Sequence, residues 1–134
     1  PEARDLDDTE WCADSARRVW VPNRNGLLIN VAACFAEALG CSRIVVGFNR
    51  EEARTFPDNS RHFVDAVNHS LTYSTLTEVR VVCYTQFLDK AEIVSLGRRL
   101  GVPWSLVWSC YRDGEQACGK CESCRRLERA GKSQ

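Results

Sequence analysis

Four cysteines within fifteen residues constrain this chain more than any other feature of its sequence. Cys110, Cys118, Cys121 and Cys124 follow the spacing C-x7-C-x2-C-x2-C. Four thiolates at this spacing can surround a zinc ion as a tetrahedron. Because the protein would fill all four positions, we expect a structural site and not a catalytic one, which keeps one position open. The pattern predicts a zinc-binding segment over residues 108–130.

Other cysteine chemistries remain alternatives to zinc. An iron–sulfur cluster also uses a C-x2-C-x2-C run, but the C-x3-C-P that follows it in ferredoxins is not found here. A redox-active C-x-x-C pair is less natural when a third and a fourth cysteine stand in register. Cys34 and Cys83 lie in apolar segments, so we expect both to be core residues.

The composition indicates a single globular domain over residues 1–134. The chain is 44% hydrophobic and carries 18 basic and 18 acidic side chains, so its formal charge is zero. Zero net charge argues against binding to nucleic acid or an anionic membrane through bulk electrostatics. No apolar run approaches the roughly 18 residues that span a bilayer, and the first twenty residues are polar. We therefore expect no membrane segment, no secretory leader and a cytoplasmic location.

Helical and extended patterns alternate along the chain. Leu28, Val31, Phe35 and Leu39 recur at helical spacing, and with the alanines among them they predict a helix buried on most sides. Residues 44–48 and 79–84 predict two strands buried on both faces, and 106–108 a third extended piece. Ser60 and Asp89 are expected to cap helices, and glycines at 40 and 101 to end them. We expect residues 1–20 to be a surface segment and the polar tail from 125 onward to fray. The alternation is typical of an α/β layer with a parallel sheet.

Two polar stretches are candidate binding sites. Asn23, Arg24 and Asn25 precede the first apolar helix, where they could cap it or bind an anion or a purine edge. Asn49, and after it Asp58 and Asn59, follow a strand, and ligands of open α/β sheets bind beyond the carboxyl ends of strands. An ordinary turn explains the second stretch equally well. No glycine-rich phosphate loop occurs anywhere in the chain, and His62 and His69 show no metal-binding pattern.

Five segments in order resemble the QueC family, the 7-cyano-7-deazaguanine synthases. They are VPNRNGLL, GFN, TFPDNS, KAEIVSLGRRLGVPWSLVWSCY and CGKCESC. The resemblance covers about residues 18 to 130, and the WSCY segment with the cysteine run is its most specific part. It implies a Rossmann-like parallel sheet of the PP-loop ATP pyrophosphatase kind, similar to the adenine nucleotide alpha hydrolases. It also implies that Cys110, Cys118, Cys121 and Cys124 are zinc ligands.

The resemblance implies a reaction as well. Such enzymes convert 7-carboxy-7-deazaguanine and ammonia to 7-cyano-7-deazaguanine through an adenylated carboxylate, using ATP with magnesium. Asn23, Arg24, Asn25, Asn49 and Asp58 are the candidate substrate-pocket residues by position. The serine-glycine-glycine-x-aspartate-serine loop that holds ATP in the family is not in this sequence, which starts at proline and has no methionine. We therefore expect the chain to be the C-terminal part of such an enzyme, or a split or degenerate homologue that needs a partner. In either case it should be inactive without the N-terminal PP-loop portion, and we expect it to form a homodimer.

Three functions remain open at this point. The first is the nitrile-forming ligase. The second is a QueC-like antiphage-defence homologue that acts on a deazapurine–protein conjugate. The third is a zinc-stabilised binding module without catalysis, although this chain has more apolar content than small zinc modules carry.

Overall fold

The computed structural model describes residue 14 and residues 16–132. The chain divides into two compact units, Trp20–Phe87 and Pro1–Val19 with Leu88–Gln134. The first unit contains α2 (Arg24–Ala38), β1 (Arg43–Val45), α3 (Arg61–Ser74) and β2 (Arg80–Val82). The second contains α4 (Lys90–Arg99) and α5 (Glu122–Lys132). Most of the expected surface segment 1–20 lies outside the described residues, and a single domain over 1–134 stays a prediction.

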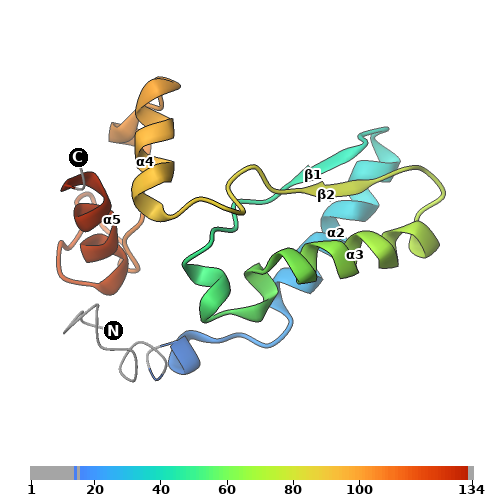
Figure 1. Cartoon of the computed structure of the whole chain (residues 1–134), viewed down its shortest axis with the longest axis horizontal. Helices are drawn as coiled ribbons and strands as arrows, with labels where there is room; N and C mark the ends of the chain where they lie inside the picture. The colour runs from blue at the N-terminus through green and yellow to red at the C-terminus, as the bar shows by residue number, and fades with distance from the viewer. Residues whose placement is uncertain (1–13, 15, 133–134) are drawn as a thin grey trace. The chain divides into compact units, whose positions relative to one another are not determined.

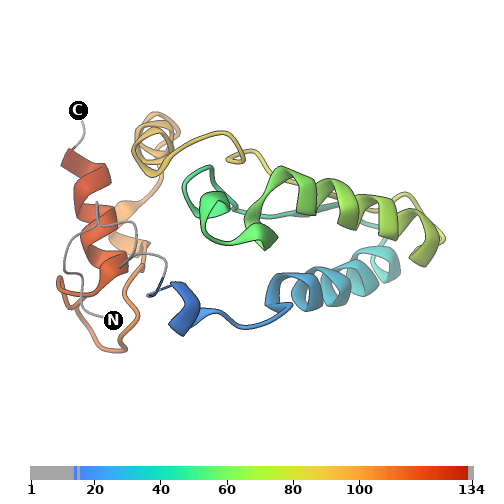
Figure 2. The same cartoon turned by 60° about the horizontal axis from the view of Figure 1, so that its bottom comes forward.

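The unit Trp20–Phe87 is built on two parallel strands. β1 pairs with β2 in the register Ile44 to Val81. Helix α2 packs against β1 and α3 against β2, and both helices run along the strands (Figure 1, Figure 2). Side chains from both helices and from both strands form one core, in which Leu71 is 1% exposed. The members of this core are Ile29, Ala33, Ile44, Val46, Phe48, Phe63, Val64, Val67, Leu71, Val81 and Cys83. An α/β arrangement with parallel strands is thereby confirmed, whereas a full Rossmann sheet is not shown.

The expectation that both faces of the strands are buried was wrong for these residues. Successive side chains of a strand point to opposite faces, and the core takes Ile44 and Val81 from one face only. On the other face Arg43 is exposed and Val45 is 64% exposed. The sheet is therefore covered by helices on one side within the described residues.

The prediction that α2 is buried on most sides was also wrong. Its buried residues are Gly26, Ile29, Ala33 and Ala36, which form one narrow face. Leu28, Val31, Phe35 and Leu39, from which the helix was predicted, are 47–74% exposed. Cys34 is exposed as well, contrary to expectation, while Cys83 is half-buried and donates to the Phe48 carbonyl at 3.2 Å. The periodicity predicted the helix correctly, but the residues that face the core are a different set from the predicted one.

Helix ends follow the local sequence closely. The Ser60 hydroxyl accepts a hydrogen bond from the Phe63 N–H, and Asp89 and Glu92 form a capping box at the start of α4. Gly40 and Gly101 have φ values of 68° and 71°. After each of them the chain closes back on its helix, with Cys41 N–H donating to the Ala36 carbonyl and Val102 N–H to the Gly97 carbonyl.

Helix α4 packs against α5 in the second unit. Ala130 of α5 is 5% exposed, and the Arg98 guanidinium donates to the Gly131 carbonyl at 3.2 Å. The tail therefore does not fray as expected; it is helical as far as Lys132. The third extended piece at 106–108 is confirmed only in part, because Leu106 closes a 3-10 turn over Trp104–Leu106, whereas Val107 after it has an extended backbone. Within the described ranges, no helix combines the length and the apolar character that a bilayer crossing demands.

We expect Gly97→Ala to destabilise the second unit. A Cβ at this position would lie 2.8 Å from Cζ2 of the Trp104 ring, so the indole would have to move. Overpacking of this kind costs about 1–3 kcal/mol. Gly47→Ala is the matched control, because a Cβ there meets no atom within 4 Å. Thermal unfolding of both variants measures the effect, and equal melting temperatures would contradict it.

Candidate metal centre

The four cysteines of the sequence motif come together in the structure. Their sulfur atoms all lie within 4.8 Å of one another, and the Sγ atoms of Cys110 and Cys121 are 4.0 Å apart. Four sulfurs at about 2.3 Å from a zinc ion lie about 3.8 Å from each other, so the cluster is nearly the size of such a tetrahedron. The residues therefore fit a bound metal ion.

Local backbone geometry directs N–H groups at these sulfur atoms. The Cys121 N–H donates to Cys118 Sγ at 3.4 Å, and the N–H groups of Arg112 and Cys118 donate to Cys110 Sγ at 3.3 and 3.4 Å. Gly119 has a φ of 66°, which only glycine adopts without strain. These bonds stabilise negative sulfur, which is the form that binds a metal.

The same bonds change the acidity of the cluster. Backbone N–H groups of Lys120 and Cys121 lower the pKa of Cys118 to about 6. For Cys121, burial opposes ionisation, but N–H donors from Tyr111 and Cys124 lower the pKa on balance. The hydrogen bond with Cys121, together with burial, raises the pKa of Cys124 to about 12. A divalent cation would relieve this last effect, because it stabilises every thiolate that surrounds it.

Helix α5 begins at the cluster. Cys121 immediately precedes the helix and Cys124 lies in its first turn, and these two are 3% and 8% exposed. Trp108 Nε1–H donates to the Cys110 carbonyl at 3.1 Å and so fixes the chain where it enters the site. Because the helix has only eleven residues, it is shorter than helices that are stable alone in water. The cluster and α4 together hold it in place.

The five predicted substrate-pocket residues all lie in the other unit. Asn23 is the N-cap of α2 with φ 56°, but its side chain makes no capping hydrogen bond, and Arg24 is exposed at the first turn. Asn25 and Asp58 are brought together, with Asn25 Nδ2 donating to the Asp58 carbonyl at 3.3 Å. Asn49 is 5% exposed and its Oδ1 accepts from the Glu52 N–H at 2.9 Å. Their role in binding stays a prediction.

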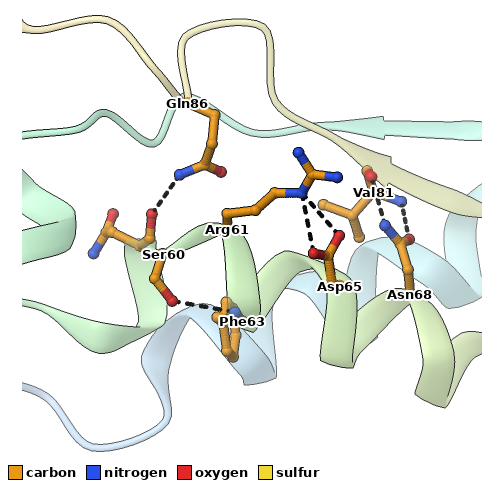
Figure 3. Close-up of polar contacts among 8 residues, drawn as sticks. Ser60, Arg61, Phe63, Asp65, Asn68, Val81 and Gln86 are labelled. Atoms are coloured by element: carbon orange, nitrogen blue, oxygen red, sulfur yellow. Dashed lines mark hydrogen bonds and ion pairs between the residues drawn. The ribbon is translucent and has the colours of Figure 1, made fainter.

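Three further polar residues belong to this unit; the sequence placed Asn59 beside Asp58 but did not find the other two. Asn59 is 6% exposed and donates through Nδ2 to the Asp58 carboxylate at 3.1 Å. Gln86 is 6% exposed and its Nε2 donates to the Asn59 carbonyl at 2.9 Å, as Figure 3 shows. Its Oε1 finds no hydrogen-bond partner among the described residues. The third, Asn68, bonds to the backbone of β2. No pattern in the sequence indicates that a single asparagine or glutamine side chain will hydrogen-bond to a residue far away in the chain.

The fold and the site together define an α/β protein with a cluster of four cysteines that could hold a metal ion and that leads into its last described helix. Comparison with known proteins makes this specific. The family model described as queuosine biosynthesis protein QueC matches residues 2–133. The chain belongs to the QueC family.

Three similar proteins are all named 7-cyano-7-deazaguanine synthase. The chain is 73% identical to the 7-cyano-7-deazaguanine synthase of Desulforudis audaxviator over 99% of its length, and 58% identical to that of Carboxydothermus hydrogenoformans over 97%. It is 52% identical to that of Methanosarcina mazei over 89% of its length. The chain spans 60%, 60% and 52% of the length of these three relatives.

Proposed function

We propose that this chain is the C-terminal part of a 7-cyano-7-deazaguanine synthase of queuosine or archaeosine biosynthesis. The family match over residues 2–133 supports this proposal. The four-cysteine cluster supports it independently, because the most specific segment of the sequence folds into a metal-binding geometry. We further propose that the metal is zinc with a structural role, since four thiolates leave no coordination position for substrate.

The proposed reaction makes a nitrile from a carboxylate in two activations. The carboxylate of 7-carboxy-7-deazaguanine attacks ATP and becomes an acyl adenylate with release of pyrophosphate. Ammonia displaces AMP to give the amide. A second ATP transfers AMP to the amide oxygen with release of a second pyrophosphate. The oxygen then leaves as part of AMP, and the nitrogen loses both of its protons as the nitrile forms. ATP with magnesium would bind to the PP-loop portion, for which this chain has no sequence motif.

The candidate pocket residues have chemistry suited to such a substrate. A carboxylate only accepts hydrogen bonds, and the ring of a deazaguanine carries N1–H and an amino group side by side. Asp58 is 9% exposed and held by Asn59, so its carboxylate is preorganised for such donors. Arg24 only donates and stands at the positive end of α2, where it suits the substrate carboxylate or a phosphate.

Arg24→Ala in the reconstituted enzyme is expected to raise KM for 7-carboxy-7-deazaguanine by about tenfold or more. A lost hydrogen bond to a charged group costs about 1.5–3 kcal/mol. The residue is exposed, so the free energy of unfolding should stay within about 0.5 kcal/mol, as is usual for surface substitutions. Arg99→Ala, an exposed arginine of α4, is the matched control. Unchanged kinetics for Arg24→Ala would mean that Arg24 does not bind the substrate and serves only as the first residue of α2.

The function itself is tested by combining the chain with the remainder of the synthase. The two polypeptides, co-expressed, should convert 7-carboxy-7-deazaguanine, ammonia and ATP to the nitrile, detected by mass spectrometry. Each polypeptide alone should give none. A deazapurine attached to protein would instead favour the defence function, and binding without turnover would favour a non-catalytic module.

A further inference from the structure

Asp58 carries a buried charge that no cation compensates. It is the only aspartate, glutamate, lysine or arginine among the buried residues of the described chain, with an exposed fraction of 9%. One carboxylate oxygen, Oδ1, accepts from Asn59 Nδ2 at 3.1 Å. The other oxygen, Oδ2, has neither a donor nor a cation among the described residues, and these residues do not enclose it fully. Buried charges are normally paired, because an unpaired one is costly. This oxygen is therefore an acceptor for a ligand with N–H donors.

Buried amides hold the Asp58 carboxylate in place. Its partner Asn59 is 6% exposed, and Gln86, also 6% exposed, donates from Nε2 to the Asn59 carbonyl at 2.9 Å (Figure 3). From α2, Asn25 Nδ2 donates to the Asp58 carbonyl at 3.3 Å. An acceptor that is already fixed binds a ligand without the entropic cost of ordering a side chain. The network therefore favours binding at Asp58.

Two aromatic rings lie close to Asp58. Trp20 and Phe56 stack with their ring centroids 6.0 Å apart and an angle of 8° between the ring planes. Phe56 stands two residues before Asp58 in the chain. The stack and the bond from Asn25 to Asp58 therefore join the same two short segments of chain at two points. Trp20 is still 37% exposed, so part of its indole stays open to a second flat group.

A guanine-type base matches both the carboxylate and the rings. Its N1–H and 2-amino groups lie side by side on one edge, so a carboxylate can accept from both of them. An adenine-type base presents an acceptor, N1, at the same place, and two acceptors repel each other. Both kinds of base can stack on an aromatic ring, because every base has a π face. The carboxylate would therefore set the preference, and the indole would add affinity.

We propose that Asp58 and the Trp20–Phe56 pair form a base-binding subsite that is complete within the unit Trp20–Phe87. The Asp58 carboxylate accepts from N1–H and the 2-amino group, while the base stacks on the open part of the Trp20 indole. The subsite binds a 7-deazaguanine without ATP and without the remainder of a synthase. That the natural ligand is a 7-deazaguanine rests on the proposed function, whereas the preference for a guanine-type edge rests on the geometry alone.

Calorimetric titration of the chain with two neutral bases tests the subsite directly. The probes are 7-deazaguanine and 7-deazaadenine, without ATP. Neither base has a carboxylate, so a contribution of Arg24 to carboxylate binding is excluded from the comparison. The chain should bind 7-deazaguanine about 100-fold or more tightly than 7-deazaadenine, because two hydrogen bonds to a charged group are lost with the second base.

Asp58→Asn separates recognition of the base edge from a role in folding. The new amide keeps an oxygen for Asn59 Nδ2 and places a nitrogen where Oδ2 was. That nitrogen repels the guanine donors but can donate to N1 of adenine. Binding of 7-deazaguanine should fall by about 100-fold or more, whereas 7-deazaadenine should bind no more weakly than to the parent chain. A loss of structure alone would weaken both bases, and circular dichroism verifies the fold.

Trp20→Ala tests the stacking surface at an exposed position and does not depend on the fold of the Asp58 variant. It should weaken binding of both bases by about tenfold and leave the preference between them unchanged, because stacking is insensitive to the base edge. Trp20→Phe, which keeps an aromatic ring, should retain most of the affinity. Tyr73→Ala is the matched control, because Tyr73 is 81% exposed and lies about 18 Å along α3 from the start of that helix.

Three results would overturn the proposal. They are no binding of 7-deazaguanine without the remainder of the synthase, equal binding of the two bases, and an unchanged preference in Asp58→Asn. The expected preference, together with a reconstituted mixture that makes no nitrile, would count against the proposed function only. Nitrile formation with an unchanged KM for 7-carboxy-7-deazaguanine in both Asp58→Asn and Trp20→Ala would count against the subsite only.

Discussion

Cys121→Ser is expected to abolish tight zinc binding and to unfold the segment from Cys110 through α5. Loss of an outer-shell partner of a zinc site alone costs up to about 100-fold in affinity, and loss of a ligand should cost more. Cys121 is 3% exposed, its Sγ lies 4.0 Å from that of Cys110, and its N–H donates to Cys118 Sγ at 3.4 Å. Because α5 is too short to persist alone, its helicity should be lost together with the metal.

The measurement combines metal content with circular dichroism. The parent chain should carry about one zinc per molecule, and Cys121→Ser should carry less and show a smaller helical signal. Cys34→Ser is the control, because Cys34 is exposed on α2 and lies outside the cluster. A chelated, reduced parent chain that melts at the same temperature as the zinc-loaded one would refute the structural role. Iron with acid-labile sulfide in place of zinc would establish the iron–sulfur alternative.

Asn68→Leu should lower the free energy of unfolding of the unit Trp20–Phe87 by about 2–4 kcal/mol. The substitution removes two hydrogen bonds of 2.7 and 2.9 Å and leaves the N–H and C=O of Val81, a residue 2% exposed, without partners. A buried group left unsatisfied costs about 1–3 kcal/mol. Leucine has the same number and branching of side-chain heavy atoms as asparagine, so the substitution removes the polar contact with little change of shape.

Asn30→Leu is the matched control for this prediction. The Asn30 side chain is exposed and donates only to the Gly26 carbonyl within its own helix, so the change should stay within about 0.5 kcal/mol. Asn68→Asp adds a pH test. The new carboxylate accepts a hydrogen bond from the Val81 N–H but cannot donate one to the Val81 carbonyl. The loss in free energy of unfolding, relative to the parent chain, should therefore become smaller at low pH, where the carboxyl group is protonated and can donate. Urea unfolding with Val81 amide exchange follows all three variants, and equal losses for Asn68→Leu and Asn30→Leu would contradict the role of Asn68.

Features that depend on neighbours in the sequence were predicted correctly. The Ser60 and Asp89 caps and the turns at Gly40 and Gly101 formed as expected, because each requires only a few adjacent residues. The cysteine cluster belongs to the same group, since fifteen residues that must surround one ion leave little freedom of arrangement. The helical tail is an exception: its sequence is polar, but packing of Ala130 and the contact from Arg98 stabilise it.

The sequence by itself determined the helix ends, the parallel α/β character and the residues that gather at the metal centre. Only the tertiary structure decided which stripe of α2 faces the core, which face of the sheet is covered, and how Asn68 bonds to β2. The physical reason is that apolar periodicity reports how much surface a helix or strand can bury, but not against what. That choice depends on residues far apart in the sequence, such as Ile29 and Val81, 52 positions apart, joining one core, which no local pattern encodes.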